Sequence, residues 1–445
     1  MRGRSTTVIL VALVVLTATA RPASAAPPVP GPQRALFGGP LNLQAREPAL
    51  GRRLDVVRIY TVWETGPTLD RAALASLTAG GARTLLISTS IPWDRWRDTA
   101  TARNRDGDPG NDLPVPWCKT RPVVPGTATP SGKTWFQAVA DGDYDAALRS
   151  WLEQVEGLAA DVPEIYVTFQ HEPDRLSDNP INGRYQRCAG TAAEYRAAWM
   201  RLRAVGDGTT PAGGPDLDAG QGGHLRWVPI FTTWGFWHTA GDDGSPVRAL
   251  VNQSTGQPPA DATGDDLTLA SGRATRWLPP AAGYDLLGTD VFNYSGSTAG
   301  GGGPRHLQVD DATTSAKEPD RWRSLEILTR PVVRWATYNA QTPTGGVRPL
   351  VLAEYGSLPD PTRPYRRAAW LGAGCRFLSS VANTRFVVAN YFDVNQMRLV
   401  GWNWTKAADG SWSATAPTGD DGPSIRALAA VGSAPRFGGT GACPP

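Results

Sequence analysis

Two glutamates stand where a carboxylate is costly unless it has a partner or a chemical role. Glu172 follows the apolar run 164–169, and Glu354 closes the apolar run 350–354. An unpaired charge is disfavoured at the end of a buried strand. Two carboxyl groups that face one cleft meet the requirement for glycoside hydrolysis, because one acid protonates the leaving oxygen while the other attacks the sugar or activates water. The alternative interpretation is a structural ion pair, for instance between Glu172 and Arg58.

Further polar and aromatic residues follow runs of the same kind. Alternation with a period of two predicts that Thr168, Gln170 and Glu172 share one side of their strand. The residues expected to bind substrate are those near strand ends, namely His171, Trp63, Trp93, Trp234, Trp237, Asn293, Tyr294, Arg58 and Trp402. The chain has 17 Trp against 10 Phe and 11 Tyr, and large flat rings of this kind stack well on the apolar faces of sugars. For His171, orientation of the acid, contact with a sugar hydroxyl and a structural hydrogen bond all stay open.

Eight short runs of apolar or β-branched residues are separated by turn residues and predict strands. They cover 35–38, 55–62, 84–88, 164–169, 225–233, 285–293, 350–354 and 385–391. Segments with helical periodicity lie between most of them, at 69–79, 135–158, 192–205, 320–339, 363–382 and 423–431. This alternation predicts a parallel sheet, and eight strands close a (β/α)8 TIM barrel. An open doubly wound sheet is the alternative, but no G-x-G-x-x-G follows the first predicted strand and the chain has no P-loop.

The long connections follow strands, at 91–133, 173–190, 238–280 and 295–319, whereas connections from a helix into a strand are short. In this fold the loops after strands build the catalytic face, so the extra length is expected there. One barrel domain from 35 to 445 then explains the chain length. A second set of tryptophans recurs at helical spacing and is expected to pack the barrel wall: Trp135, Trp151, Trp199, Trp322, Trp335 and Trp370.

Five segments, in order and spacing, resemble the core of glycoside hydrolase family 26, the secreted β-mannanases and related endo-β-glycanases among the clan A barrels. They are IYVTFQHEPD, YRAAWMRLR, LRWVPIFTTW, YDLLGTDVFNY and PLVLAEYG, and the resemblance covers roughly residues 35 to 400. It implies that Glu172 is the acid/base and that Glu354 is the nucleophile. It also implies a retaining mechanism through a covalent glycosyl-enzyme, for which the carboxyl groups lie about 5–5.5 Å apart.

The chain departs from the family pattern at three places. The family has Arg-Pro-Phe-His-Glu before the acid, whereas this chain has Thr168 at the position of the arginine, and Arg58 is a candidate for the missing positive charge. Pro173 and Asp174 replace the usual Met-Asn, and Phe292 stands where the family has a tyrosine near the nucleophile. Two functions follow. The first is a retaining β-glycanase acting on a mannan-type or related glycan. The alternative is a non-catalytic carbohydrate-binding barrel, which the missing arginine favours.

The N-terminal residues have the pattern typical of a targeting segment. A basic start, an apolar stretch from 8 to 20 and the small residues before position 26 predict a signal peptide over 1–25, followed by a Pro-rich leader over 26–34. We therefore expect a secreted, extracellular protein. The four cysteines then predict two disulfides, and of the three possible pairings we prefer 118 with 188 and 375 with 443.

Several classes of partner are disfavoured. A net charge of +3 with 19% charged residues gives little reason to expect nucleic acid, and no later apolar run is long enough for a membrane span. No metal or cofactor is expected, because H-E-P-D-R lacks the second histidine of H-E-x-x-H and the chain holds only four His. The loop 106–112 has the oxygen density of a calcium site, but a solvated turn is the preferred interpretation. A monomer that binds a polysaccharide or oligosaccharide is the expectation.

Overall fold

A computed structural model describes residues 34–62, 84–90, 133–160, 162, 164–176, 189–207, 225–236, 272–293, 323–340, 342, 346–359, 365–380, 383, 385–393, 398–406 and 412–444. Several of the sequence predictions lie outside these ranges. Among them are the signal peptide at 1–25, the helix at 69–79, the loop at 106–112, and the cysteines at 118 and 188.

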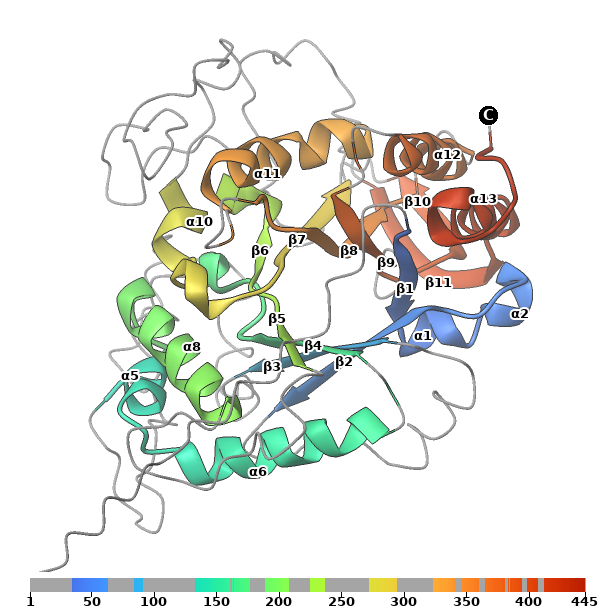
Figure 1. Cartoon of the computed structure of the whole chain (residues 1–445). Coiled ribbons are helices and arrows are strands. Elements are labelled where there is room, and N and C mark those ends of the chain that lie inside the picture. The colour runs from blue at the N-terminus through green and yellow to red at the C-terminus, as the bar shows by residue number, and fades with distance from the viewer. Residues whose placement is uncertain are drawn as a thin grey trace, which may run out of the picture.

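The core of the fold is a sheet of nine parallel strands in the order β5-β4-β3-β2-β1-β9-β8-β7-β6 (Figure 1). The strands are β1 (Leu36–Pro40), β2 (Val56–Val62), β3 (Thr84–Ser90), β4 (Glu164–Phe169), β5 (Leu225–Trp227), β6 (Ile230–Thr232), β7 (Leu287–Asn293), β8 (Leu350–Ser357) and β9 (Phe386–Tyr391). The two end strands, β5 and β6, follow each other directly in the chain. The sheet therefore closes through them into a (β/α)8 barrel, as the eight predicted strands require.

The predicted fifth strand is broken in the middle rather than continuous. Val228 and Pro229 separate β5, which pairs with β4, from β6, which pairs with β7. Proline has no N–H to donate to a strand ladder. The break is still bridged on both sides, because the Val228 N–H donates to Val167 O at 2.9 Å and the Gly288 N–H donates to Pro229 O at 2.8 Å. One interrupted strand thus serves both neighbours.

Apolar residues on both faces of the strands build two cores. A smaller one fills the barrel interior and includes Val56, Leu86, Tyr166 and Ile230. The larger one lies between the outer face of the strands and the helices. Alternate side chains of a strand point to opposite faces, so strands buried on both sides must be apolar throughout, which explains the unbroken runs in the sequence.

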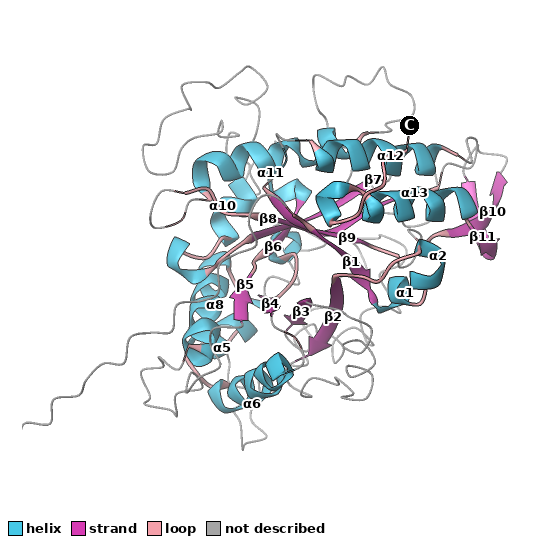
Figure 2. Ribbon diagram, turned by 45° about the vertical axis from the view of Figure 1, so that its right-hand side comes forward, coloured by secondary structure: helices cyan, strands magenta, loops and turns pink. Residues whose placement is uncertain are grey.

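Helices surround the sheet (Figure 2). They are α1 (Leu41–Gln44), α2 (Glu47–Leu50), α5 (Trp135–Ala140), α6 (Asp145–Glu156), α8 (Ala192–Gly206), α10 (Gly272–Trp277), α11 (Leu325–Asn339), α12 (Arg366–Ser379) and α13 (Gly422–Ser433). Short 3-10 turns are η3 (Gly157–Ala160), η4 (Pro173–Leu176), η5 (Thr233–Phe236), η6 (Ala281–Gly283) and η10 (Pro435–Phe437). None of the helices in the described part of the chain is both long and apolar enough to cross a membrane.

The helix predicted over 135–158 is wrong in its length, because two helices replace it. The chain turns between α5 and α6, and Gly142 adopts a φ of 85° there. A positive φ costs glycine little, so this residue can end one helix and allow the next to begin. The tryptophans expected in the wall are buried where the structure describes them, namely Trp135, Trp151, Trp199, Trp335 and Trp370.

After the last barrel strand the chain forms a hairpin and returns to the wall. β10 (Val400–Lys406) and β11 (Trp412–Asp420) pair antiparallel in a separate two-stranded sheet. Arg46, beyond α1, contacts Asp393 at 2.7 Å and Asp420 at 2.6 Å. These ion pairs link the start of the barrel to the end of β9 and to the hairpin.

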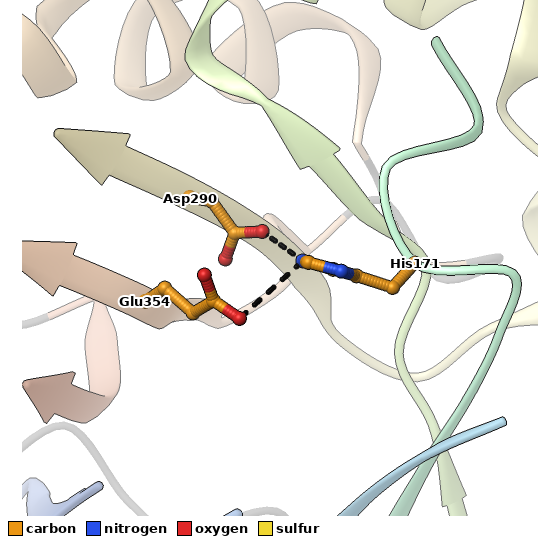
Figure 3. A group of neighbouring side chains, drawn as sticks. All are labelled: His171, Asp290 and Glu354. Carbon is orange, nitrogen blue, oxygen red and sulfur yellow. Dashed lines mark hydrogen bonds and ion pairs between the residues drawn. The ribbon is translucent and has the colours of Figure 1, made fainter. Parts of the chain in front are cut away.

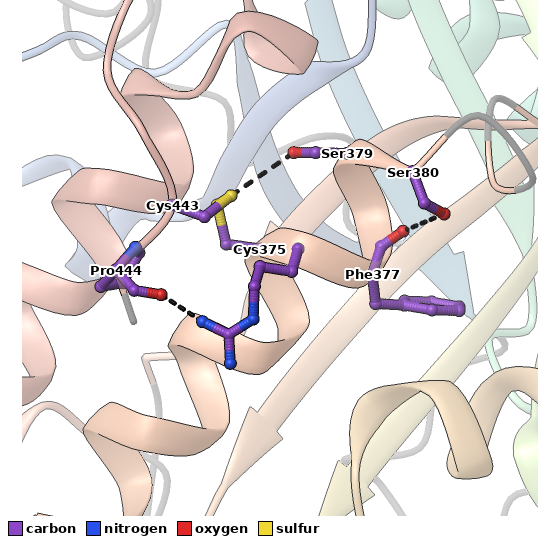
Figure 4. Close-up of a disulfide and its surroundings, with 7 residues drawn as sticks. Cys375, Phe377, Ser379, Ser380, Cys443 and Pro444 are labelled. Atoms are coloured by element: carbon purple, nitrogen blue, oxygen red, sulfur yellow. Dashed lines mark hydrogen bonds between the residues drawn. A yellow bond between two sulfur atoms is a disulfide. The ribbon is translucent and has the colours of Figure 1, made fainter.

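The disulfide predicted between Cys375 and Cys443 is confirmed (Figure 4). Cys375 lies on α12 and is buried, and the two Cα atoms are 5.6 Å apart. The bond ties the C-terminal segment to the barrel wall across a sequence separation of 68 residues.

Candidate active site

The polar residues at the carboxyl ends of the strands meet at one end of the barrel. Arg58 and Tyr60 come from β2, Asp290 from β7 and Glu354 from β8, while His171 follows β4. Figure 3 shows His171 pointing toward the carboxyl groups of Asp290 and Glu354. All strands of the sheet are parallel, so their carboxyl ends gather these side chains from distant parts of the sequence.

Glu354 lies at the centre of this cluster. Its side chain is 5% exposed, and Oε1 lies 3.1 Å from Nη1 of Arg58 and 3.7 Å from Nε2 of His171. The Tyr60 hydroxyl donates a hydrogen bond to the same Oε1. The carboxylate therefore has a cation and a hydroxyl donor on the oxygen that faces the cluster.

A β-bulge turns Glu354 toward the barrel axis. The pairing of β8 with β7 shifts by one residue after Leu352, so that Asp290 pairs with Glu354 rather than with Ala353. Ala353 packs in the barrel interior, and Glu354 next to it also reaches the interior residue Arg58. An extra residue in a strand lets two consecutive side chains take the same side, which is a common way to aim a side chain at a site.

Arg58 is fully buried and supplies the positive charge of the site. Its guanidinium donates to Ala353 O at 2.7 Å and to Ser88 Oγ at 3.2 Å, and it lies 3.4 Å from Asp290 Oδ1. Burial alone would lower the pKa of Arg58, but the charge of Glu354 and of its neighbours raises the pKa above its ordinary value. Arg58 thus places a permanent positive charge beside Glu354.

Among the residues that the structure describes, the acids outnumber the cations in this space. Burial raises the pKa of Asp290 well above its ordinary value despite Arg58, and Glu172 and Asp174 raise it further. Burial likewise raises the pKa of Glu354 from 4.5 to about 7, against the opposing effect of Arg58. The cluster therefore holds protons at neutral pH that free carboxyl groups would have lost.

His171 and Asp290 form the second contact pair of the site. Nε2 of His171 meets Oδ2 of Asp290, whose side chain has no exposed surface. The His171 side chain is 21% exposed, so part of it is accessible to solvent. A carboxylate partner of this kind fixes the orientation of the ring.

Glu172 sits in a turn and not in the strand. β4 ends at Phe169, and both Gln170 (φ 51°) and Glu172 (φ 53°) adopt left-handed backbone conformations. The predicted alternation from Thr168 to Glu172 is therefore wrong beyond the end of the strand. Left-handed residues other than glycine cost of order 1–3 kcal/mol each and persist where their surroundings hold them. Glu172 is buried, and its charge acts on Arg58, Asp290 and Glu354.

The remaining predicted substrate contacts are only partly described. The structure does not describe Trp63, Trp93, Trp237 and Tyr294, and for Trp234 in η5 and Trp402 in β10 it describes the backbone alone. The sugar contacts of these six residues stay predictions.

Asn293 is described and buried. Its Nδ2 donates to Ser357 Oγ at 3.1 Å, and its Oδ1 accepts from the Arg323 N–H at 3.4 Å. The first bond joins the ends of β7 and β8, and the second joins β7 to the segment before α11, so Asn293 has a structural role beside any contact with a sugar.

Tyr60 and Asp290 were not among the predicted site residues. The signals for them existed: Tyr60 lies two residues after Arg58 on the same face of β2, and Asp290 is a carboxylate within the predicted strand 285–293. Within the described residues, His171, Asp290 and Glu354 could offer ligand atoms within 4.8 Å of one another to a metal. The Arg58 guanidinium already lies against both carboxyl groups, so we assign no metal there.

The fold defined by this sheet is that of the (β/α)8 barrels. No protein-family model matches the chain, and no curated protein matches it.

Among solved structures, GH26C from Muricauda sp. is 10% identical, with 91% of this chain and 87% of that chain covered and a TM-score of 0.46. A double mutant of the endo-β-1,4-mannanase of Cellulomonas fimi is 13% identical, with 93% and 75% covered and a TM-score of 0.44. GH5_18 from Bifidobacterium longum is 12% identical, with 90% and 79% covered and a TM-score of 0.40. At these identities and TM-scores we rest the function on the geometry of the site.

Proposed function

We propose that the protein is a secreted retaining glycoside hydrolase that cleaves a β-linked polysaccharide, of mannan type or a related β-glycan, by double displacement. The observation that carries the proposal is the environment of Glu354. A buried carboxylate at the carboxyl end of a barrel strand faces a guanidinium and a tyrosine hydroxyl on one oxygen. A second carboxyl group, that of Glu172, acts electrostatically on the same site.

In this mechanism Glu354 is the nucleophile. Its carboxylate attacks the anomeric carbon while Glu172 gives its proton to the leaving glycosidic oxygen, and a covalent glycosyl-enzyme forms. Glu172, now a carboxylate, takes a proton from water, and the resulting hydroxide displaces Glu354 and releases the sugar. Net retention at the anomeric carbon follows from the two inversions.

The neighbours of Glu354 have defined tasks in this scheme. Arg58 favours the ionised form that attacks, and Tyr60 holds one oxygen of the carboxylate in place. Asp290 fixes the ring of His171, the residue that precedes the acid/base. Desolvation strengthens each of these interactions relative to water.

The alternative function, a carbohydrate-binding barrel without catalysis, was favoured by the missing strand-four arginine alone. Arg58 stands 3.1 Å from Glu354 and offers the charge that this arginine would have brought. We therefore prefer the enzyme. Within the proposal the signal peptide covers 1–25, the leader 26–34 and the barrel domain 35–445, and the mature protein acts as an extracellular monomer.

The test is a hydrolysis screen of the mature protein on mannan, xylan and mixed-linkage β-glucan, with Glu172→Gln and Glu354→Gln beside it. The exposed Glu153 on α6 supplies a control variant, Glu153→Gln. We expect wild type and the control to release sugar with retained configuration, which NMR of the first product measures. We expect both site variants to lose most activity. Binding without hydrolysis by wild type would support the alternative, and equal activity of all four proteins would remove both catalytic assignments.

A further inference from the structure

The turn that carries Glu172 is held in an unfavourable backbone conformation by contacts with the strand next to it. Gln170 and Glu172 are the two residues other than glycine with positive φ in the described part of the chain, and they flank His171. L-residues rarely adopt this conformation without support from their surroundings. The contacts that hold the turn therefore decide where the carboxyl group of Glu172 is presented.

Three bonds connect residues 172–174 to β6. The Glu172 N–H donates to Ile230 O at 2.9 Å. Two residues further on, Asp174 Oδ1 accepts from the Thr232 N–H at 3.0 Å, and Asp174 Oδ2 accepts from the Thr232 hydroxyl. Asp174 is 1% exposed, so both of these bonds are buried.

The same strand end also reaches Asp290. The Thr233 hydroxyl donates to Asp290 O, and Asp290 in turn contacts His171. Thr232 and Thr233 thus join the turn after β4 to the residue that fixes His171. A buried carboxylate that accepts a backbone N–H and a hydroxyl forms strong, well-directed hydrogen bonds.

We propose that Asp174 is a positioning residue for the acid/base Glu172. By clasping Thr232 with both oxygens, it keeps the turn in the left-handed conformation in which Glu172 faces the leaving-group oxygen. Asp174 itself transfers no proton to substrate. The inference rests on the proposed function for the role of Glu172, whereas the clasp is a property of the fold and can be measured without activity.

Leaving-group dependence is the readout that separates positioning of an acid from general damage. A 2,4-dinitrophenyl β-glycoside needs no protonation of its leaving group, whereas an unactivated phenyl β-glycoside does. We expect Asp174→Ala to lower kcat/KM on the phenyl glycoside roughly 30- to 100-fold, because complete loss of a general acid costs about 10²–10⁴. Its kcat/KM on the dinitrophenyl glycoside should fall by less than about threefold, since kcat/KM reports the formation of the glycosyl-enzyme, which comes before Glu172 acts as a base.

Three further variants define the cause. Asp174→Asn keeps one oxygen for the Thr232 N–H and can donate its amide to the Thr232 hydroxyl, so it should behave nearly as wild type. Thr232→Val removes the hydroxyl alone and should show the same selective loss, but a smaller one. The matched control is Asp285→Ala. Asp285 also accepts a backbone N–H, that of Trp227 at 2.8 Å, but it lies before the first residue of β7 and therefore at the end of the barrel away from the site. This variant should leave the ratio of the two rates unchanged.

Hydrogen–deuterium exchange of the peptide around residues 170–176 tests the clasp directly. Asp174→Ala and Thr232→Val should increase exchange of the Glu172 amide, while Asp174→Asn and Asp285→Ala should not. Unchanged exchange in Asp174→Ala, an equal loss on both glycosides, or an Asp174→Asn variant as impaired as the alanine variant would overturn the proposal. If wild type cleaves neither glycoside, the proposed function fails, and the exchange result alone decides whether Asp174 holds the turn.

Discussion

The buried ionisation of Glu354 predicts how the stability of the protein depends on pH. Its pKa is about 7 in the folded chain against an ordinary value of 4.5. This difference corresponds to roughly 3 kcal/mol, at about 1.4 kcal/mol for each step of one in pKa. Because the folded state binds the proton more tightly, the contribution is fully present below pH 4.5. It is lost as the pH rises through 7, so wild-type stability declines over this window.

Replacement of Glu354 by glutamine removes that dependence. Glutamine resembles the protonated acid in shape and carries no charge, so Glu354→Gln should match wild type in stability near pH 4. By pH 8 it should be more stable than wild type by roughly 3 kcal/mol, because wild type then carries a buried charge whose ionisation is unfavourable. The gain would accompany a loss of catalysis if Glu354 is the nucleophile.

Urea unfolding followed by tryptophan fluorescence at half-unit steps from pH 4 to 8 measures this difference. Subtracting wild type from the variant cancels the titration of shared groups remote from Glu354, so the difference reports Glu354 together with its coupled neighbours Asp290, His171 and Glu172. The exposed Glu153→Gln variant is carried through the same series as a control for the assay. A difference between Glu354→Gln and wild type that stays flat across the range, or that turns against the variant as the pH rises, would refute the assigned environment of Glu354.

Three further predictions follow from contacts of the site and of the wall. Tyr60→Phe removes a hydrogen bond to the ionised carboxylate of Glu354 that is worth about 1.5 kcal/mol, so the pKa of Glu354 should rise by about one. The acidic limb of the kcat/KM profile should then move upward by about one pH unit from its wild-type position near 7. An acidic limb that does not move would show that Tyr60 does not affect the ionisation of Glu354. Arg58→Met leaves the buried carboxylate of Glu354 without its cation and should lower the free energy of unfolding by about 3–5 kcal/mol at pH 8. The loss should be smaller at pH 5, where the carboxyl group takes up a proton. Denaturant titrations at both pH values measure the difference. Cys375→Ser with Cys443→Ser opens a bridge across 68 residues and should lower the free energy of unfolding by about 2–4 kcal/mol without altering kcat; unchanged denaturation midpoints under non-reducing conditions would contradict it.

The barrel was predictable because its signal is local and repeated. Each strand is a short apolar run that ends in turn residues, and the eight predicted runs correspond to the strands of the sheet, with 225–233 divided at Pro229. A strand buried on both faces must be apolar throughout, so its sequence marks it without knowledge of its partners. The break at Pro229 and the turn at Gly142 lie where proline and glycine change local geometry. The sequence shows both residues, but it did not predict that one would interrupt a strand and that the other would end a helix.

The partners inside the site were harder to predict, because they depend on pairing between distant strands. The contact of Tyr60 with Glu354 spans 294 residues, and that of His171 with Asp290 spans 119. Nothing in the spacing within either segment specifies such a neighbour. It follows from which strands lie opposite each other in a closed barrel and from the register between them.

Both candidate catalytic glutamates occupy places where regular strand geometry fails. Strict alternation from Ala353 would turn the Glu354 side chain outward, toward the helices, and the β-bulge brings it inward instead. Strict alternation through Gln170 would place Glu172 in β4, which has already ended at Phe169. The sequence nevertheless located both, because a carboxylate after an apolar run is conspicuous whatever its exact orientation. Chemical type thus made both residues candidates, whereas the alternation predicted for Glu172 was wrong. The left-handed turn that carries Glu172 has a conformational cost, which contacts such as that of Asp174 with Thr232 offset. The experiments on that contact test whether the strained turn is needed to position Glu172.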